Sequence, residues 1–289
     1  MTPEPTPPPA GPSRPGPGPG ATAREPVLSV EDLHVDFRLD STVVHAVRGV
    51  SWQVAAGETL AVVGESGSGK TASALSVLRL NPEPPCVYAG GRILFAGEDL
   101  LSCGEKHLGR IRGGSVSMVF QDPMTSLDPL QRVGTQVAEV LRHHRGASRA
   151  EAREAAVAAL DEVGVPDAER RYRQYPHELS GGLRQRVMIA AALVGRPKVL
   201  IADEPTTALD VTVQRQILDL LVTLQARHGM AVVLITHDLG VVAETADRVV
   251  VMNRGEVVET GGVLDVFEHP EDPYTRALLA ATPRLERTA

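Results

Sequence analysis

Gly64-Glu-Ser-Gly-Ser-Gly-Lys-Thr71 is the stretch from which the fold of this chain is best predicted. It fits the pattern of Gly, four residues, Gly-Lys and then Ser or Thr, which is typical of phosphate-binding loops. Residues 58–63 before it form an apolar run of strand length, and residues 71–80 space their apolar side chains as a helix does. A glycine-rich loop before an ordinary helix is the alternative interpretation, which this flanking pattern disfavours. The stretch therefore predicts that the chain binds a nucleoside triphosphate.

The residues of this loop have distinct predicted roles. Gly64, Gly67 and Gly69 allow the backbone to curl so that successive N–H groups point at an anion. Lys70 is expected to reach the β- and γ-phosphates, and the Thr71 hydroxyl is expected to ligate Mg²⁺. The predicted nucleotide-binding residues of the loop are Gly64, Glu65, Ser66, Gly67, Ser68, Gly69, Lys70 and Thr71.

The composition of the 289-residue chain disfavours some functions and compartments. Its formal net charge of −7 argues against nucleic acid as the main partner, because phosphate backbones attract clustered Lys and Arg. Cys86 and Cys103 lack the spacing of a metal site and suit a reducing compartment. No apolar run approaches the ~18 residues of a membrane span, and the N-terminus lacks the layout of a signal peptide. We therefore expect the protein in the cytoplasm.

The chain is predicted to contain one ordered domain between short tails. Nine of the first twenty residues are proline, so residues 1–25 are expected to be disordered because they cannot bury enough apolar surface. The domain is expected over 26–284, followed by a tail at 285–289. Apolar alternation over 27–54 predicts two or three antiparallel strands. A helical insertion is predicted over about 123–188, and the strands and helices that alternate around it predict a mostly parallel sheet.

Local signals predict the ends of two helices outside the phosphate loop. Ser148-Arg-Ala-Glu151 is a capping box, in which the serine hydroxyl and the glutamate carboxylate satisfy the first free amides of a helix. A second helix is predicted to begin near Val211 and to end at Gly229, because glycine readily adopts the left-handed conformation that ends a helix.

Val199-Leu-Ile-Ala-Asp-Glu204 is an apolar strand that ends in two carboxylates. Asp203 is predicted to hold Mg²⁺ through water, and Glu204 is predicted to orient and deprotonate the attacking water. Adjacent acidic residues after a strand are common at protein surfaces, so the pair alone is weakly informative. In combination with the phosphate loop upstream it predicts a site that hydrolyses the nucleotide.

Leu179-Ser-Gly-Gly-Leu-Arg-Gln185 is similar to the signature peptide of the ATP-binding cassette (ABC) superfamily, which this chain therefore resembles. Ser180 and the amides of Gly181 and Gly182, at a predicted helix start, would make a second anion cradle. In the superfamily this cradle covers the γ-phosphate of ATP held by a partner cassette. The resemblance thus implies two ATP molecules sandwiched between two cassettes. As a lone motif, the peptide is also consistent with a flexible helix cap.

The resemblance extends to three further motifs in the expected order. Gln121 matches the glutamine that senses Mg²⁺ and connects to the transport subunit, which makes it a predicted catalytic and metal-site residue. Asp210, in Thr207-Ala-Leu-Asp210, matches the loop that crosses the interface between cassettes. His237 matches the switch histidine that contacts the γ-phosphate, although a solitary histidine after a strand is usually structural. The predicted catalytic set is Glu204, His237 and Gln121.

Phe37 best matches the aromatic residue that stacks on adenine in the superfamily. Residues 38–44 are expected to form a loop that is longer than in many cassettes. Because such a loop shifts the alignment, His45 is an alternative stacking residue.

Three stretches narrow the resemblance to the cassettes of oligopeptide, dipeptide and nickel importers. They are residues 120–129, residues 175–190 and the C-terminal residues 269–279, the last within a predicted subfamily motif at 264–284. The resemblance implies an α/β fold: a P-loop NTPase (RecA-like) core with an antiparallel β subdomain and an inserted α-helical subdomain.

The resemblance also implies a function, which is that of an ATPase subunit powering a peptide importer from the cytoplasmic face of the cell membrane. It implies ATP and Mg²⁺ as cofactors. Its implied partners are a second cassette (a copy of this chain or, as the subfamily favours, a homologue), two membrane permease subunits and an extracytoplasmic solute-binding protein. No nucleic acid partner is expected. The alternatives are the same role for nickel or another small solute, and a cassette ATPase acting on DNA or ribosomes, which the short helical insertion and the acidic balance disfavour.

Overall fold

Residues 25–122, 126–207 and 209–281 are described by the structure, which is a computed structural model, and their strands form two sheets. The larger sheet has the order β10-β9-β3-β8-β7-β6. Its strands are β3 (Thr59–Val63), β6 (Val116–Val119), β7 (Val199–Asp203), β8 (Ala231–Ile235), β9 (Arg248–Asn253) and β10 (Glu256–Gly262). All neighbouring strands in it are parallel except β9 and β10, which are antiparallel. The predicted mostly parallel sheet is therefore confirmed.

The larger sheet is buried on both faces, which explains why its central strands are continuous apolar runs. Along β7, Leu200 and Ala202 face a core shared with the helical part of the chain. Val199 and Ile201 face a second core shared with the smaller sheet. Alternate residues of one strand thus serve two different cores.

The smaller sheet has the order β2-β1-β4-β5 and is antiparallel. Its strands are β1 (Pro26–Leu39), β2 (Thr42–Ala55), β4 (Cys86–Phe95) and β5 (Glu98–Asp99). The predicted long loop at 38–44 is wrong, because Arg38 pairs with Val43 and Leu39 pairs with Thr42. Strand pairing continues almost to the tip of the hairpin, so the connection is a tight turn.

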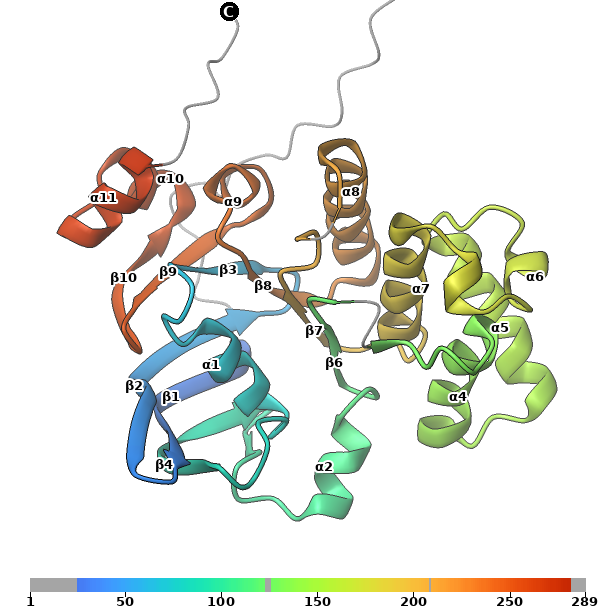
Figure 1. Cartoon of the computed structure of the whole chain (residues 1–289), viewed down its shortest axis with the longest axis horizontal. Helices are drawn as coiled ribbons and strands as arrows, with labels where there is room; N and C mark the ends of the chain where they lie inside the picture. The colour runs from blue at the N-terminus through green and yellow to red at the C-terminus, as the bar shows by residue number, and fades with distance from the viewer. Residues whose placement is uncertain (1–24, 123–125, 208, 282–289) are drawn as a thin grey trace, which may run out of the picture.

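The helices are distributed around the two sheets (Figure 1). Helices α4 to α7 lie together on one side of the molecule, and α1 lies between the two sheets. The helices are α1 (Lys70–Val77), α2 (Glu105–Ile111), α4 (Val133–Arg145), α5 (Arg149–Glu162), α6 (Ala168–Arg171), the 3₁₀ helix η1 (Pro176–Glu178), α7 (Gly181–Leu193), α8 (Val211–His228), α9 (Leu239–Thr245), α10 (Val263–Glu268) and α11 (Pro273–Ala281). The predicted capping box at Ser148 and the predicted end of α8 at Gly229 are both confirmed. Among the described helices, none is long and apolar enough to cross a membrane.

The α/β core with an antiparallel sheet and a group of helices confirms the predicted fold class. The predicted disordered tail at 1–25 lies outside the described residues except for Glu25, and so does the predicted tail at 285–289. The predicted domain limits therefore stay predictions.

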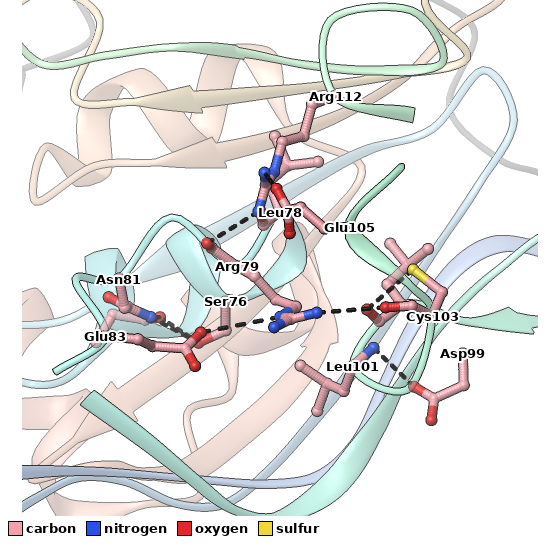
Figure 2. Close-up of polar contacts among 12 residues, drawn as sticks. Ser76, Leu78, Arg79, Asn81, Glu83, Asp99, Leu101, Cys103, Glu105 and Arg112 are labelled. Atoms are coloured by element: carbon pink, nitrogen blue, oxygen red, sulfur yellow. Dashed lines mark hydrogen bonds and ion pairs between the residues drawn. The ribbon is translucent and has the colours of Figure 1, made fainter. Parts of the chain in front are cut away.

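The C-terminal end of α1 is tied to the segment that precedes β6 (Figure 2). Arg112 donates from Nε to the Leu78 carbonyl at 2.7 Å and from Nη2 to the Arg79 carbonyl at 3.2 Å, and it pairs with Glu105. Arg79 in turn donates from Nη1 to the Cys103 carbonyl at 3.3 Å. The two hydrogen bonds from Arg112 satisfy carbonyls that the end of the helix leaves free. They hold α1, whose first residue is Lys70, in a defined position.

Candidate nucleotide-binding site

The carboxyl ends of four strands meet at one edge of the larger sheet. Strand β3 leads into the phosphate loop, β6 leads to Gln121, β7 ends at Asp203, and β8 is followed by His237. The parallel register places these ends side by side, because Val62 and Asp203 both pair with Ile235. This is the edge at which open α/β sheets bind ligands.

Lys70 is buried at the start of α1, and its ammonium group is held by the phosphate loop itself. Its Nζ donates to the Gly64 and Glu65 carbonyls, each at 2.8 Å, and lies 3.4 Å from Ser68 Oγ. Burial lowers the pKa of Lys70, and the negative charges of Glu204 and Asp203 oppose this shift. The loop thus holds a cation in the position where a phosphate group is predicted to bind.

Two glycines of the loop are required by close backbone approaches. Gly64 has a φ of 149°, and a Cβ there would collide with the Met252 carbonyl oxygen. Gly69 has a φ of 98°, and a Cβ there would collide with the Ala46 carbonyl oxygen of β2. Strands from both sheets therefore press directly on the loop, and only glycine leaves room for them.

The phosphate loop forms one wall of a cleft of about 680 Å³. This volume falls within the range of about 300–1,000 Å³ that is typical of small-ligand sites. The cleft is lined by Ala46, Glu65, Ser66, Gly67, Gly69, Lys70, Thr71, Ala72, Gln121, Glu204 and His237. Most of the predicted site residues are thus brought together, whereas Gly64, Ser68 and Asp203 support the cleft from buried positions.

Asp203 and Thr71 form the contact between the end of β7 and the start of α1. Thr71 Oγ1 donates to Asp203 Oδ1 at 3.2 Å. Burial raises the pKa of Asp203 to about 6, and the charge of Glu204 adds to this, while the Thr71 hydrogen bond and the charge of Lys70 oppose it. The Asp203 carboxylate and the Thr71 hydroxyl beside it are hard oxygen donors, the kind of ligand that Mg²⁺ prefers.

Glu204 is the centre of the polar contacts in the cleft. Its Oε2 accepts hydrogen bonds from Gln121 Nε2 at 3.0 Å and from Thr207 Oγ1 at 2.8 Å, and its Oε1 lies 3.2 Å from His237 Nδ1. Burial by itself raises the pKa of Glu204. The hydrogen bonds from Thr207 and His237, with the positive charges of His237 and Lys70, outweigh burial and leave this pKa below its usual value. Glu204 is therefore an ionised acceptor at neutral pH.

The backbone of Glu204 is held in an uncommon conformation. Its φ is 44°, in the left-handed region that residues other than glycine rarely adopt. Its N–H donates to the Ile235 carbonyl of β8 at 2.9 Å, which fixes the turn after β7. Such strain is found where a side chain must be presented in one direction, and here the side chain is presented to the cleft.

The residues of the signature peptide lie outside the lining of this cleft. Ser180 is exposed at the N-cap of α7, followed by Gly181 and Gly182 in the first turn. A Cβ at Gly182 would lie 2.7 Å from Val213 Cγ1, so the glycine allows α7 to approach α8 closely. Asp210 caps α8, because its Oδ1 accepts from the Val213 N–H at 3.0 Å. Their predicted contact with a partner's nucleotide stays a prediction.

Phe37, the predicted adenine-stacking residue, is not among the residues that line the cleft. Its side chain packs against the core between the smaller sheet and α1, and its strand partner is Val44. His45, the alternative, is exposed, and its Nδ1 lies 2.7 Å from Asp36 Oδ1. Ala46 is the residue of this hairpin that reaches the cleft.

Sequence reasoning missed two residues of this site. Thr207 donates to Glu204, although its motif predicted only an interface role. Its position three residues after a candidate base is a weak signal for such a contact. Ala46 lines the cleft, and nothing in the sequence marks it.

Comparison with known proteins assigns the chain to a family. The family model described as "ABC transporter" matches residues 47–207, which is more than half of the chain. The chain belongs to the ABC transporter family. Within this family, the chain is 52% identical to the oligopeptide transport ATP-binding protein OppD of Bacillus subtilis (strain 168) over 90% of this chain and 73% of the relative. It is 50% identical to the dipeptide transport ATP-binding protein DppD of the same organism, over 91% of this chain and 78% of that relative.

Solved ABC structures resemble the chain as well. A dimeric ATP-binding cassette in a post-hydrolysis state, bound to ADP and Pi, is 28% identical. It matches with a TM-score of 0.73 over 82% of this chain and 98% of the solved chain. The predicted resemblance to ABC cassettes, and to those of oligopeptide and dipeptide importers in particular, is confirmed.

Proposed function

We propose that this chain is the ATP-binding and ATP-hydrolysing subunit of an importer that carries peptides across the cytoplasmic membrane. The observation that carries the proposal is the cleft in which a buried lysine on the phosphate loop faces an ionised glutamate hydrogen-bonded to Gln121 and Thr207. A cation for phosphate and a base for water are the two parts that phosphoanhydride hydrolysis needs. The names of the relatives, oligopeptide and dipeptide transport ATP-binding proteins, support peptides as the cargo.

The polar residues of the cleft have proposed parts in the reaction. The loop amides and Lys70 bind the β- and γ-phosphates, with the Lys70 ammonium held beside the loop by the Gly64 and Glu65 carbonyls. Glu204 orients the attacking water and accepts its proton. His237, which lies beside Glu204, is placed to contact the γ-phosphate.

Thr71, Asp203 and Gln121 are the residues that we propose for Mg²⁺. They supply a hydroxyl, a carboxylate and an amide oxygen, the hard donors that Mg²⁺ prefers alongside phosphate oxygens. The raised pKa of Asp203 fits this assignment, because a nearby dication favours the charged carboxylate. When bound, Mg²⁺ neutralises negative charge on the phosphates.

We further propose that two cassettes close over two ATP molecules. Ser180, Gly181, Gly182 and Asp210 then act on the nucleotide of the partner, which is consistent with their position outside the cleft of their own chain. Closure by ATP and opening after hydrolysis would move two permease subunits, with an extracytoplasmic protein delivering the peptide. The dimeric state of the similar solved cassette supports the first step.

The proposal is tested by two linked experiments on the native transporter. Gentle solubilisation and capture of this chain should yield two multispanning permeases and a second cassette. Uptake of a radiolabelled dipeptide or oligopeptide should then be lost from cells that carry Glu204→Gln in place of the wild-type chain. Uptake of nickel instead of peptide would favour the alternative cargo, and capture of ribosomal proteins or DNA without a permease would refute transport.

A further inference from the structure

The C-terminal helix reaches back to the phosphate loop. The Glu65 N–H donates to Tyr274 Oη at 3.0 Å, although the two residues are 209 positions apart in the sequence. Tyr274 is the second residue of α11 (Pro273–Ala281), which lies with α10 beside β10 at the edge of the larger sheet (Figure 1). Tyr274 also belongs to the C-terminal motif that the nucleotide chemistry leaves without a role.

Tyr274 is held in this position by contacts of its own segment. Its ring packs against a core that includes Val63, the last residue of β3 before the loop. Its N–H donates to Asp272 Oδ1 at 2.7 Å. Glu259 of β10 accepts from the Glu271 N–H at 2.9 Å and the Asp272 N–H at 3.1 Å. The tyrosine hydroxyl is thus presented from a docked segment.

The contact acts on the same peptide group that holds the lysine. The Glu65 N–H and the Gly64 carbonyl belong to one planar peptide group, in which they point in opposite directions. Tyr274 accepts from the N–H, and Lys70 Nζ donates to the carbonyl at 2.8 Å. Any rotation of this peptide group would therefore change both contacts together. The planar Gly64–Glu65 peptide group therefore connects Tyr274 to the Lys70 ammonium.

We propose that Tyr274 is a positioning residue for ATP binding. Its hydroxyl holds the Gly64–Glu65 peptide group in the orientation that keeps the Lys70 ammonium in the cleft. Tyr274 contacts the loop from outside the cleft lining, so its proposed effect on ATP acts through the loop. This inference rests on the proposed ATPase function and adds a residue to it.

Tyr274→Phe tests the proposal, because it keeps the ring in the core and removes only the hydroxyl. Losing one hydrogen bond that preorganises the loop should raise the KM for ATP, and the Kd of a fluorescent ATP analogue, by about three- to tenfold. The kcat should change less than about twofold, because the loop reaches the same bound state. The matched control is Tyr172→Phe, which removes a hydroxyl from a tyrosine outside the cleft lining.

A second variant tests the route of the effect. Glu259→Ala removes the acceptor that docks the tail, so it should raise the Kd and KM in the same direction. The Kd of the double variant should be no higher than the higher Kd of the two single variants, because both substitutions act through the contact between Tyr274 and the Glu65 N–H. Measurements use the full chain, with thermal unfolding recorded for every variant.

The inference fails if wild-type chain binds and hydrolyses ATP while Tyr274→Phe changes only the unfolding temperature and leaves Kd and KM as in Tyr172→Phe. It also fails if the two single variants are fully additive. A wild-type chain that binds ATP but never hydrolyses it, alone or in the captured transporter, would instead overturn the proposed ATPase function. In that case the Kd comparison still decides whether Tyr274 positions the loop.

Discussion

Replacing Glu204 by glutamine should separate ATP binding from hydrolysis. The substitution keeps the size of the side chain and removes its negative charge and its ability to accept a proton. Glu204 now receives hydrogen bonds from Gln121 and Thr207 on one oxygen and faces His237 with the other. A glutamine has a single oxygen and an NH₂ group, so it keeps the bonds from Gln121 and Thr207 only if its NH₂ group faces His237 Nδ1, which must then be the acceptor.

The size of the effect follows from these contacts. A positioned general base contributes about 10²- to 10⁴-fold to a rate, which corresponds to about 3–5 kcal/mol of activation free energy. The altered contact with His237 should lower the free energy of unfolding by only about 1 kcal/mol. ATP affinity should fall little or rise, because Lys70 is held by backbone carbonyls and the substitution removes a negative charge beside the phosphates.

Single-turnover phosphate release and nucleotide titration on the same preparation measure both quantities. The control is Glu244→Gln, which removes the same charge from the surface of α9, where Glu244 pairs with Arg215. Release of phosphate at the wild-type rate by Glu204→Gln would refute the assignment of the base. A loss of ATP affinity as large as the loss of hydrolysis rate would refute the assignment of hydrolysis to Glu204 and of ATP binding to the phosphate loop.

Two further predictions concern stability. Arg112→Ala removes two hydrogen bonds to carbonyls at the end of α1 and an ion pair, so the free energy of unfolding in urea should fall by about 1–3 kcal/mol. The fall should be smaller in Arg112→Lys. An unchanged midpoint of urea unfolding in Arg112→Ala would contradict a stabilising role of these contacts. His144 has a pKa lowered first by burial and then by the charge of His143, so the unfolded state binds its proton more tightly. The free energy of unfolding should therefore decrease as the pH falls from 8 through about 6.5 towards the lower pKa of folded His144. The decrease should be smaller in His144→Gln. Equal slopes against pH in the two proteins would contradict this role of His144.

Much of the site could be predicted from short stretches of sequence. The phosphate loop and the strand that ends in Asp203 and Glu204 are each encoded within about ten residues, because strand, turn and helix signals are local. The capping box at Ser148 and the helix end at Gly229 are equally local, and both are found where they were predicted.

Other features could not be predicted because they depend on strand pairing. The hairpin between β1 and β2 pairs Arg38 with Val43, so the expected loop does not form. This pairing turns Phe37 towards the core and brings Ala46 to the cleft instead. Cross-strand register is a property of the sheet, and a one-residue difference moves a side chain to the opposite face.

The sequence by itself therefore determined the class of fold, the phosphate loop and the acidic pair, because spacing and periodicity along the chain encode them. Only the tertiary structure decided which residues surround Glu204, that Phe37 packs against the core, and that Tyr274 accepts a hydrogen bond from the phosphate loop. Tyr274 and Glu65 meet across 209 residues because the β9–β10 hairpin and α11 return the chain to the end of β3. No local pattern encodes such a contact, since it arises from how separate elements pack into one core.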